Sequence, residues 1–296
     1  MTLAIDSEKR ALVQQVGQRL IERVKGSGVT LVEMQEDGKG PRLARENGYS
    51  TGAATLFTGS GTLLRIGDRL FLLTALHVLK DPRKERVAWI HHRHGGTLRV
   101  EQPAIVMAHS DEETDAAVLE LHPDWARERG LLDDDTSFIS LTDILPVVDP
   151  EDLMPGDCIA IYGTPKQLTQ VDEDGRALLR PLIYVGTYEE PWMSALVPPS
   201  LAVLLEPLGL GSESEVPTST PDPAGMSGGS AWLLDPKPPL NLALVGVQLG
   251  QSKTASKTML RVGLIADWLN LLATGWGEDV RAALDRSFPG EAENES

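Results

Sequence analysis

The sequence predicts a mainly β protein that carries a helix near each end. About a dozen short apolar runs of β type, separated by Gly, Pro and Asp, occupy residues 29–265. Almost no helical periodicity interrupts them, and short strands at such spacing are typical of antiparallel barrels or sandwiches. The chain has 296 residues, which at roughly 150 residues per domain fits one large domain or two modest ones.

Both helices are predicted from apolar residues that recur at steps of three and four. In the segment 1–28, the apolar residues between positions 12 and 24 share one face, and glycines at 26 and 28 end the pattern. Residues 265–272 repeat it with Ile265, Trp268, Leu269 and Leu272. We expect each helix to pack on the β body by this face, with partner recognition as the alternative for the first.

Acidic residues are concentrated in two segments. Residues 122–157 contain ten acidic side chains and two arginines, and residues 278–295 contain six acidic side chains and two arginines. Runs of like charge are usually solvated connections or tails. We therefore expect an acidic linker over residues 126–155 and an acidic tail over residues 274–296.

Composition excludes several classes of protein. The net charge of −16 opposes binding of a phosphate backbone, so nucleic acid is not expected as a partner. Cys158 is the single cysteine, so no disulfide can form within the chain. No run of about 18 apolar residues and no secretory apolar core are found, so we expect a cytoplasmic protein that does not contact a membrane.

The sharpest local signal is a G-x-S-x-G pattern at residues 225–229, with Ser227 at its centre. An α/β-hydrolase needs its histidine after the serine, yet all six histidines precede it, which excludes that architecture if Ser227 is a nucleophile. The subtilisin order needs an acid before the histidine. The nearest one, Asp68, belongs to a predicted Gly-Asp hairpin turn.

The remaining chain order is histidine, aspartate, serine. His77 lies in LTALHVL, directly after a predicted hairpin, and Asp115 lies in TDAAVLEL, just before a predicted strand. With Ser227, these segments resemble the T-A-x-H, D-x-A-V/L and G-x-S-G-G motifs of chymotrypsin-fold (trypsin-like) serine peptidases. The resemblance extends over most of residues 29–272 and is nearest to bacterial intracellular and high-temperature-requirement protease domains.

The resemblance implies a domain organisation. It predicts two six-stranded antiparallel β-barrels with the active site in the cleft between them. The first barrel would span residues 29–125 and supply His77 and Asp115. The second would span residues 156–273, supply Ser227 and end in the C-terminal helix.

The resemblance also implies a serine endopeptidase that cuts a peptide or protein substrate without a cofactor or a metal. His77 would take the proton of Ser227, and Asp115 would fix the imidazole tautomer. The backbone N–H groups of Gly225 and Ser227 would hold the oxyanion. Three residues of the segment VGVQLG would pair with the bound peptide: Gln248, Leu249 and Gly250.

Two departures from the family pattern leave alternatives open. Met226 stands where animal trypsins carry an aspartate, so we expect a site that is either formed constitutively or ordered by an activating protein partner. The Pro-rich segment 212–224 motivates a second hypothesis, a protease-like binding module without a competent oxyanion loop. An esterase on the same fold is a third. Asp222 lies one position from the expected base of the specificity pocket, so the primary specificity stays unassigned.

Other candidates for a role in a site have plainer interpretations. Asp111 competes with Asp115 for the acid role but lacks a following apolar strand. His91, His92 and His94 offer imidazole ligands, yet alternation on an exposed hairpin explains them, and no metal is expected. The acidic charge predicts a weak preference of the cleft for basic peptides, which salt would screen.

Overall fold

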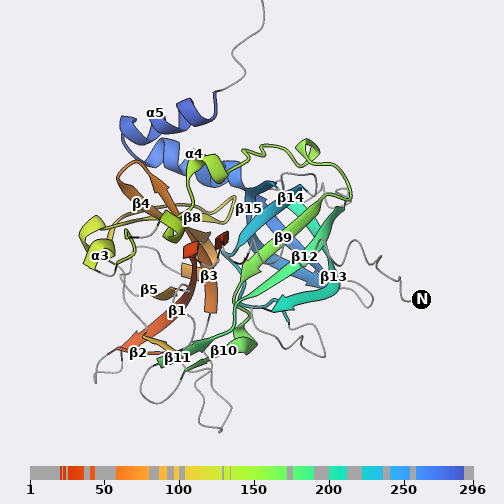
Figure 1. The fold of residues 1–296 in the computed structure, drawn as a ribbon, viewed down its shortest axis with the longest axis horizontal. Coiled ribbons are helices and arrows are strands. Elements are labelled where there is room, and N and C mark those ends of the chain that lie inside the picture. Colours follow the sequence, from red (N-terminus) through yellow and green to blue (C-terminus); the bar gives the residue numbers. More distant parts are fainter. Residues whose placement is uncertain are drawn as a thin grey trace, which may run out of the picture.

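The computed structural model describes residues 21, 23, 24, 26–36, 41–43, 58–79, 87–91, 97–99, 104–128, 130–133, 135–171, 176–189, 200–211, 222–235, 241–253 and 258–289. The prediction of a mainly β protein is confirmed. A closed antiparallel barrel lies beside a second antiparallel sheet, and two helices pack together next to that sheet (Figure 1).

The closed barrel is built by the C-terminal half of the chain. Its six strands follow the order β12-β13-β16-β15-β14-β9, and every neighbouring pair is antiparallel. Side chains that alternate along the strands fill its interior, among them Ile159, Ile161, Leu260 and Val262. The strand bounds are Cys158–Gly163 (β9), Leu182–Glu189 (β12), Ser200–Gly211 (β13), Ser230–Asp235 (β14), Asn241–Lys253 (β15) and Thr258–Leu264 (β16).

The N-terminal half forms a seven-stranded sheet in the order β2-β1-β3-β4-β8-β7, with β5 paired to β1. Within the described residues this sheet does not close, so one of the two predicted barrels is confirmed. The predicted hairpin turn is present between β3 and β4, where Gly67 has a φ of +59°. The strand bounds are Gly28–Glu36 (β1), Pro41–Leu43 (β2), Thr58–Ile66 (β3), Arg69–Ala75 (β4), Val87–His91 (β5), Ile105–Asp111 (β7) and Ala116–Leu121 (β8).

A small third sheet joins the two halves of the chain. It contains β6 (Thr97–Arg99) from the first half, and β10 (Thr169–Val171) and β11 (Arg176–Leu179) from the second. Strand β6 pairs with β11, so backbone hydrogen bonds cross between the halves. The sequence analysis included β6 among its apolar runs but gave no sign of this pairing.

The acidic connection is more ordered than its charge suggests. It holds α3 (Pro123–Glu128) and three 3₁₀ turns (Asp135–Ser137, Leu141–Asp143 and Pro150–Asp152). Ile139 bridges to Leu64 in the first sheet, and Ile144 bridges to Leu244 in the barrel. Several acids cap turns, since the Asp152 carboxylate accepts the N–H groups of Val148 and Asp149. Interspersed apolar residues therefore fasten this segment to both halves.

Two helices, α4 and α5, follow the last strand of the barrel. The predicted helix is present as α4 (Ile265–Gly275), with the four expected apolar residues buried. Within the segment expected as an acidic tail from residue 274, α5 (Glu278–Ser287) follows and packs beside α4 through Val280 and Leu284 (Figure 1). Of the predicted N-terminal helix, the described positions between 21 and 27 are helical, and residues 1–20 lie outside the described residues.

The two halves share one hydrophobic core. Phe71 and Leu73 of the first sheet belong to the same buried cluster as Trp232 and Val247 of the barrel. Trp276 adds an edge-to-face contact with Phe71, with ring centroids 5.2 Å apart. The shared core fixes the position of each half against the other.

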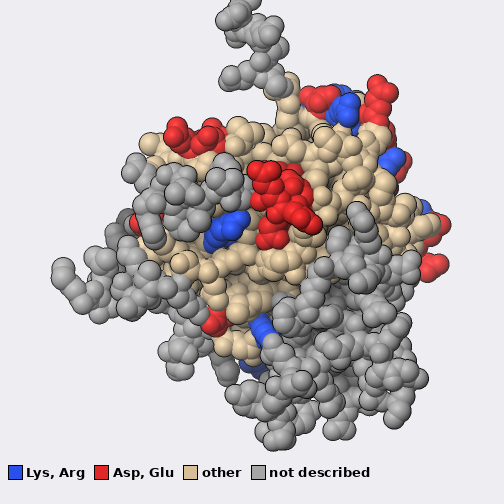
Figure 2. All heavy atoms as spheres, turned by 180° about the vertical axis from the view of Figure 1, so that it is seen from behind, with Lys and Arg blue, Asp and Glu red and all other residues tan. Residues whose placement is uncertain are grey.

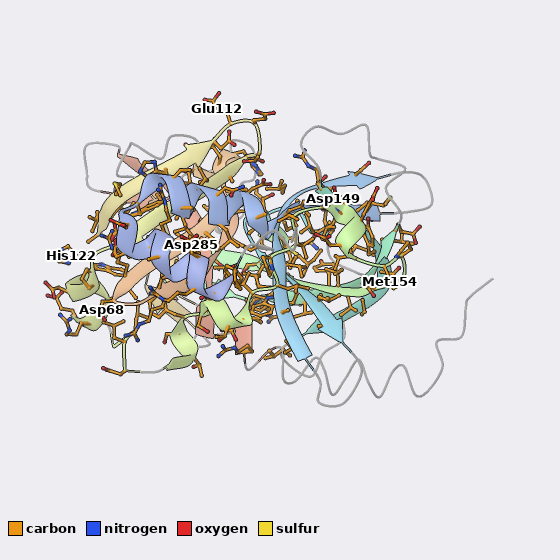
Figure 3. All side chains as sticks on the ribbon, turned by 90° about the horizontal axis from the view of Figure 1, so that it is seen from above. Asp68, Glu112, His122, Asp149, Met154 and Asp285 are labelled. Carbon is orange, nitrogen blue, oxygen red and sulfur yellow. The ribbon has the colours of Figure 1, made fainter. Side chains whose placement is uncertain are left out.

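Charged side chains lie on the surface of this body. Figure 2 shows acidic side chains gathered in a dense patch near the middle of one face. Figure 3 shows Glu112 at the tip of the turn after β7, Asp149 and Met154 on the connection, and Asp285 on α5; all four side chains are exposed. No helix in the described part of the chain is long and apolar enough to cross a membrane.

Candidate active site

Strand pairing brings His77 and Asp115 together. In the antiparallel pair of β4 and β8, the last residue of β4, Ala75, lies opposite the first residue of β8, Ala116. The chain leaves β4 into the short helix α2 (Leu76–Leu79), which carries His77, and it enters β8 directly from Asp115. Residues 38 positions apart in the sequence therefore meet at one end of the sheet.

The Asp115 carboxylate contacts His77 twice. Its Oδ2 lies 2.7 Å from Nδ1 of the imidazole, and its Oδ1 accepts the backbone N–H of His77 at 3.0 Å. Asp115 has a φ of +59°, a left-handed conformation that aspartate adopts more readily than most residues. Because an ionised carboxylate only accepts hydrogen bonds, this contact favours the tautomer with the proton on Nδ1. The lone pair on Nε2 is then available as a base.

Asp111, the competing acid, has a different role. Its carboxylate accepts the backbone N–H of Glu113 at 2.9 Å and the hydroxyl of Thr114 at 3.1 Å. These bonds hold the turn between β7 and β8. Of the two acids, Asp115 is the one that faces the histidine.

The loop that carries Ser227 is held by backbone hydrogen bonds. The N–H of Gly228 donates to the carbonyl of Gln248 at 2.7 Å, and the N–H of Gln248 donates to the carbonyl of Gly229 at 2.8 Å. Gly225 and Gly228 have φ values of +95° and +89°, which only glycine adopts without strain. Met226 is completely buried in the barrel core, so an apolar contact anchors the loop where animal trypsins have an acid.

A buried polar joint ties this loop to the first sheet. Ser60 of β3 donates its N–H to the carbonyl of Ser227 at 2.6 Å and accepts the N–H of Thr164 on its hydroxyl at 3.0 Å. The Ser60 carbonyl accepts the hydroxyl of Thr74 at 2.8 Å, and the carbonyl of Thr74 accepts the indole N–H of Trp268 at 2.9 Å. The joint therefore links both β units and helix α4 immediately behind the serine.

A cleft of about 390 Å³ brings most of the predicted site residues together. His77 lines it from the first half of the chain, and Ser227 lines it from the second. The other four predicted oxyanion and strand positions also line it: Gly225, Gln248, Leu249 and Gly250. Asp115 is absent from the lining and contacts the imidazole through Nδ1. The sequence analysis missed Lys166 and Gln251, which lie in the same cleft.

The hydroxyl of Ser227 is directed away from His77. It donates to the carbonyl of Leu249 at 3.4 Å, the long end of the range for a hydrogen bond. Among the described residues, no hydrogen bond joins Ser227 to His77, and the N–H groups of Gly225 and Ser227 donate to no acceptor. Transfer of the hydroxyl proton to the imidazole would require this hydroxyl to turn away from Leu249.

Models of known protein families and the curated proteins give no match to this chain. The assignment of a function therefore depends on the three ordered motifs and on the geometry of the site.

Two further polar groups of the cleft are informative. The Gln248 amide nitrogen donates to the carbonyl of Gly250 at 2.9 Å, whereas its Oε1 is buried without a hydrogen-bond partner among the described residues. The Asp222 carboxylate accepts the side-chain amide of Gln251 at 2.9 Å and the N–H of Ala224 at 3.0 Å. Asp222 thus helps to order the approach to the serine loop.

The histidine run gives no metal centre that the structure describes. His91 lies in β5, and His92 and His94 lie outside the described residues. In the described part of the chain, no three ligating side chains gather to hold an ion.

Proposed function

We propose that the protein is a serine endopeptidase with the two-barrel chymotrypsin fold, acting through His77, Asp115 and Ser227. The observation that carries the proposal is the 2.7 Å contact of Asp115 with His77, which lines the same cleft as Ser227. The motifs predict these three residues, and the fold brings them together from positions as far as 150 residues apart. The single cysteine, with no disulfide to form, fits work in the reducing cytoplasm.

The proposed reaction begins when the Ser227 hydroxyl turns toward the imidazole. His77 Nε2 takes the hydroxyl proton while Oγ attacks the carbonyl carbon of the scissile peptide bond. The N–H groups of Gly225 and Ser227 are the donors for the negative oxygen that forms, and each such donor typically contributes about 3 kcal/mol. The imidazolium then gives its proton to the departing amine, and an acyl-enzyme remains.

Water completes the proposed cycle. His77 Nε2 takes a proton from the water molecule, and the water oxygen attacks the acyl carbon. Collapse of the second tetrahedral intermediate breaks the ester bond and returns the proton to Oγ of Ser227. Asp115 holds the imidazole in one tautomer and stabilises its charged form throughout.

The orientation of the serine favours a second candidate, a protease-like binding module. The Ser227 hydroxyl is directed to Leu249 rather than to His77, which is an arrangement that an inert site would also have. Under the first proposal, this arrangement is a resting state that substrate or an activating partner changes. The buried Met226 supports a preformed loop, because its anchor needs no freed N-terminal amine.

Covalent labelling distinguishes these functions. A fluorophosphonate probe should label the wild-type chain at Ser227, located by peptide mapping, and Ser227→Ala should abolish both labelling and peptide cleavage. Ser287→Ala, at an exposed serine of α5, is the matched control and should keep both. A folded wild-type protein that is neither labelled nor able to cleave any peptide would refute the enzyme and leave the binding module. Cleavage of esters alone would indicate the esterase.

A further inference from the structure

A second and smaller pocket lies beside the candidate cleft. Its volume is about 180 Å³, and residues of the adjacent strands β13, β15 and β16 line it. Leu260 and Val262 of β16 fill the barrel interior, so the alternating residues Met259 and Arg261 point to the outer face. Because Met259 and Arg261 line it, the pocket lies at the outer barrel wall. The rest of its lining is Ser200, Leu201, Ala202, Gly250, Gln251, Ser252 and Leu260.

Arg261 is the charged residue of this pocket. Of the described residues that line it, no other carries a charge. The Arg261 Nε is buried and has no hydrogen-bond partner in the described part of the chain, and no ion pair to this side chain is found there. A guanidinium has five donors and no acceptor, so a buried N–H without a partner costs free energy. A ligand that supplies an acceptor would remove this cost.

The pocket adjoins the cleft at Gly250 and Gln251, which line both. Around Gly250, a Cβ atom would meet nothing within 4 Å, so no side chain separates the two spaces at that point. An extended peptide advances about 3.3 Å per residue and directs alternate side chains to one side. A peptide with its scissile bond at Ser227 would therefore place a side chain at the pocket a few residues away.

We infer that this pocket is a distal subsite that selects peptides with an acidic side chain two to four residues from the scissile bond. The inference rests on the proposed function, since it names the class of substrate for that site. Arg261 binds the carboxylate of a glutamate or aspartate, because the planar guanidinium matches two carboxylate oxygens at once. Gly250 lines both the subsite and the cleft that holds Ser227.

In this pocket, the contact of an acidic side chain with Arg261 outweighs repulsion by the overall negative charge of the protein. The net charge of −16 opposes an acidic peptide at long range, but screening limits that effect to about 8 Å at physiological salt. A partly buried contact with Arg261 is screened much less. The preference for an acid at this one position should therefore persist at 0.15 M salt.

The test compares cleavage of a proteome-derived peptide library by the wild type, Arg261→Met and Arg261→Lys. Arg261→Met keeps the length of the side chain without its charge, and Arg286→Met on the exposed surface of α5 is the matched control. The wild type and the control should show acidic residues enriched at one position two to four residues from the cut. Arg261→Met should lose this preference by roughly tenfold, while its cleavage of peptides with glutamine there is unchanged. Arg261→Lys should keep part of it.

Two outcomes would overturn the inference. One is a wild-type profile without acidic enrichment at any of these positions, and the other is enrichment that survives in folded Arg261→Met. Affinity selection of the same library on Ser227→Ala separates this failure from failure of the proposed function. If the wild type cleaves nothing, Arg261-dependent retention of acidic peptides supports the subsite and refutes the protease, whereas retention that ignores Arg261 refutes the subsite.

Discussion

Replacement of Gly228 by alanine tests whether the joint behind Ser227 holds the two halves together. Gly228 has a φ of +89°, and an added Cβ would lie 1.9 Å from the carbonyl oxygen of Ser60 and 2.2 Å from the hydroxyl of Thr74. Atoms cannot approach so closely, so the serine loop and β3 must move apart. The movement acts directly on the hydrogen bond that the N–H of Ser60 donates to Ser227.

The expected cost of Gly228→Ala has two parts. A left-handed conformation costs a residue with a Cβ about 1–2 kcal/mol. Separation of the joint weakens two or three hydrogen bonds worth about 1 kcal/mol each, among them the bond from Thr74 to Ser60. We therefore expect Gly228→Ala to lower the free energy of unfolding by about 3–5 kcal/mol.

Gly156→Ala is the matched control. Gly156 has a φ of +91°, almost the same as Gly228, but nothing lies within 4 Å of an added Cβ. Urea unfolding at equilibrium should show a loss of about 1–2 kcal/mol for this variant, which isolates the conformational cost. Equal losses of stability in Gly156→Ala and Gly228→Ala would refute the idea that the joint holds the two halves together. The contact of the added Cβ with Ser60 would then cost no stability beyond the left-handed conformation.

Three further predictions concern the acid, the loop anchor and pH. Asp115→Asn should slow phosphonate labelling by about 10³–10⁴-fold because it disturbs the imidazole tautomer, and Asp111→Asn should leave the rate unchanged. Met226→Ala should lower the free energy of unfolding in urea by about 2–5 kcal/mol, against less than about 0.5 kcal/mol for Met154→Ala, which is 74% exposed. Burial and the neighbouring Asp111 raise the pKa of Asp267 to about 6. The free energy of unfolding of the wild type therefore falls as pH rises from about 4 to 6, because the folded state keeps this proton to a higher pH than the unfolded chain does. Asp267→Asn cannot ionise, so its advantage over the wild type in free energy of unfolding should grow by about 1–2 kcal/mol between pH 4.5 and 7.5. A gain that does not vary with pH would contradict that assignment.

The strands and the contact of His77 with Asp115 follow from local sequence signals. His77 comes directly after one apolar strand and Asp115 directly before another, so antiparallel pairing of those strands is enough to make them neighbours. The Gly-Asp turn between β3 and β4 was predictable for the same reason, since glycine tolerates the φ of +59° that the turn needs. Each of these features depends on residues within a few positions of it.

Features that depend on distant partners could not be predicted in this way. Ser60 and Thr74 occur in runs that indicate only strands, and their partners Thr164 and Trp268 are 104 and 194 residues away. Helix α5 was missed because most of its residues are polar, and two apolar side chains on one face are a weak signal. Arg261 alternates with apolar neighbours along a strand, and only the folded barrel opens a pocket around it.

The hydrogen bond from Trp268 to Thr74 has a consequence for the order in which the protein matures. The ribosome releases the chain from its N-terminus, so the sheet that carries His77 and Asp115 emerges long before helix α4. The joint behind Ser227 lacks its last donor until residue 268 has left the ribosome. A partly synthesised chain therefore cannot complete the joint. Under the proposed function, nascent proteins nearby would be spared from a prematurely assembled protease.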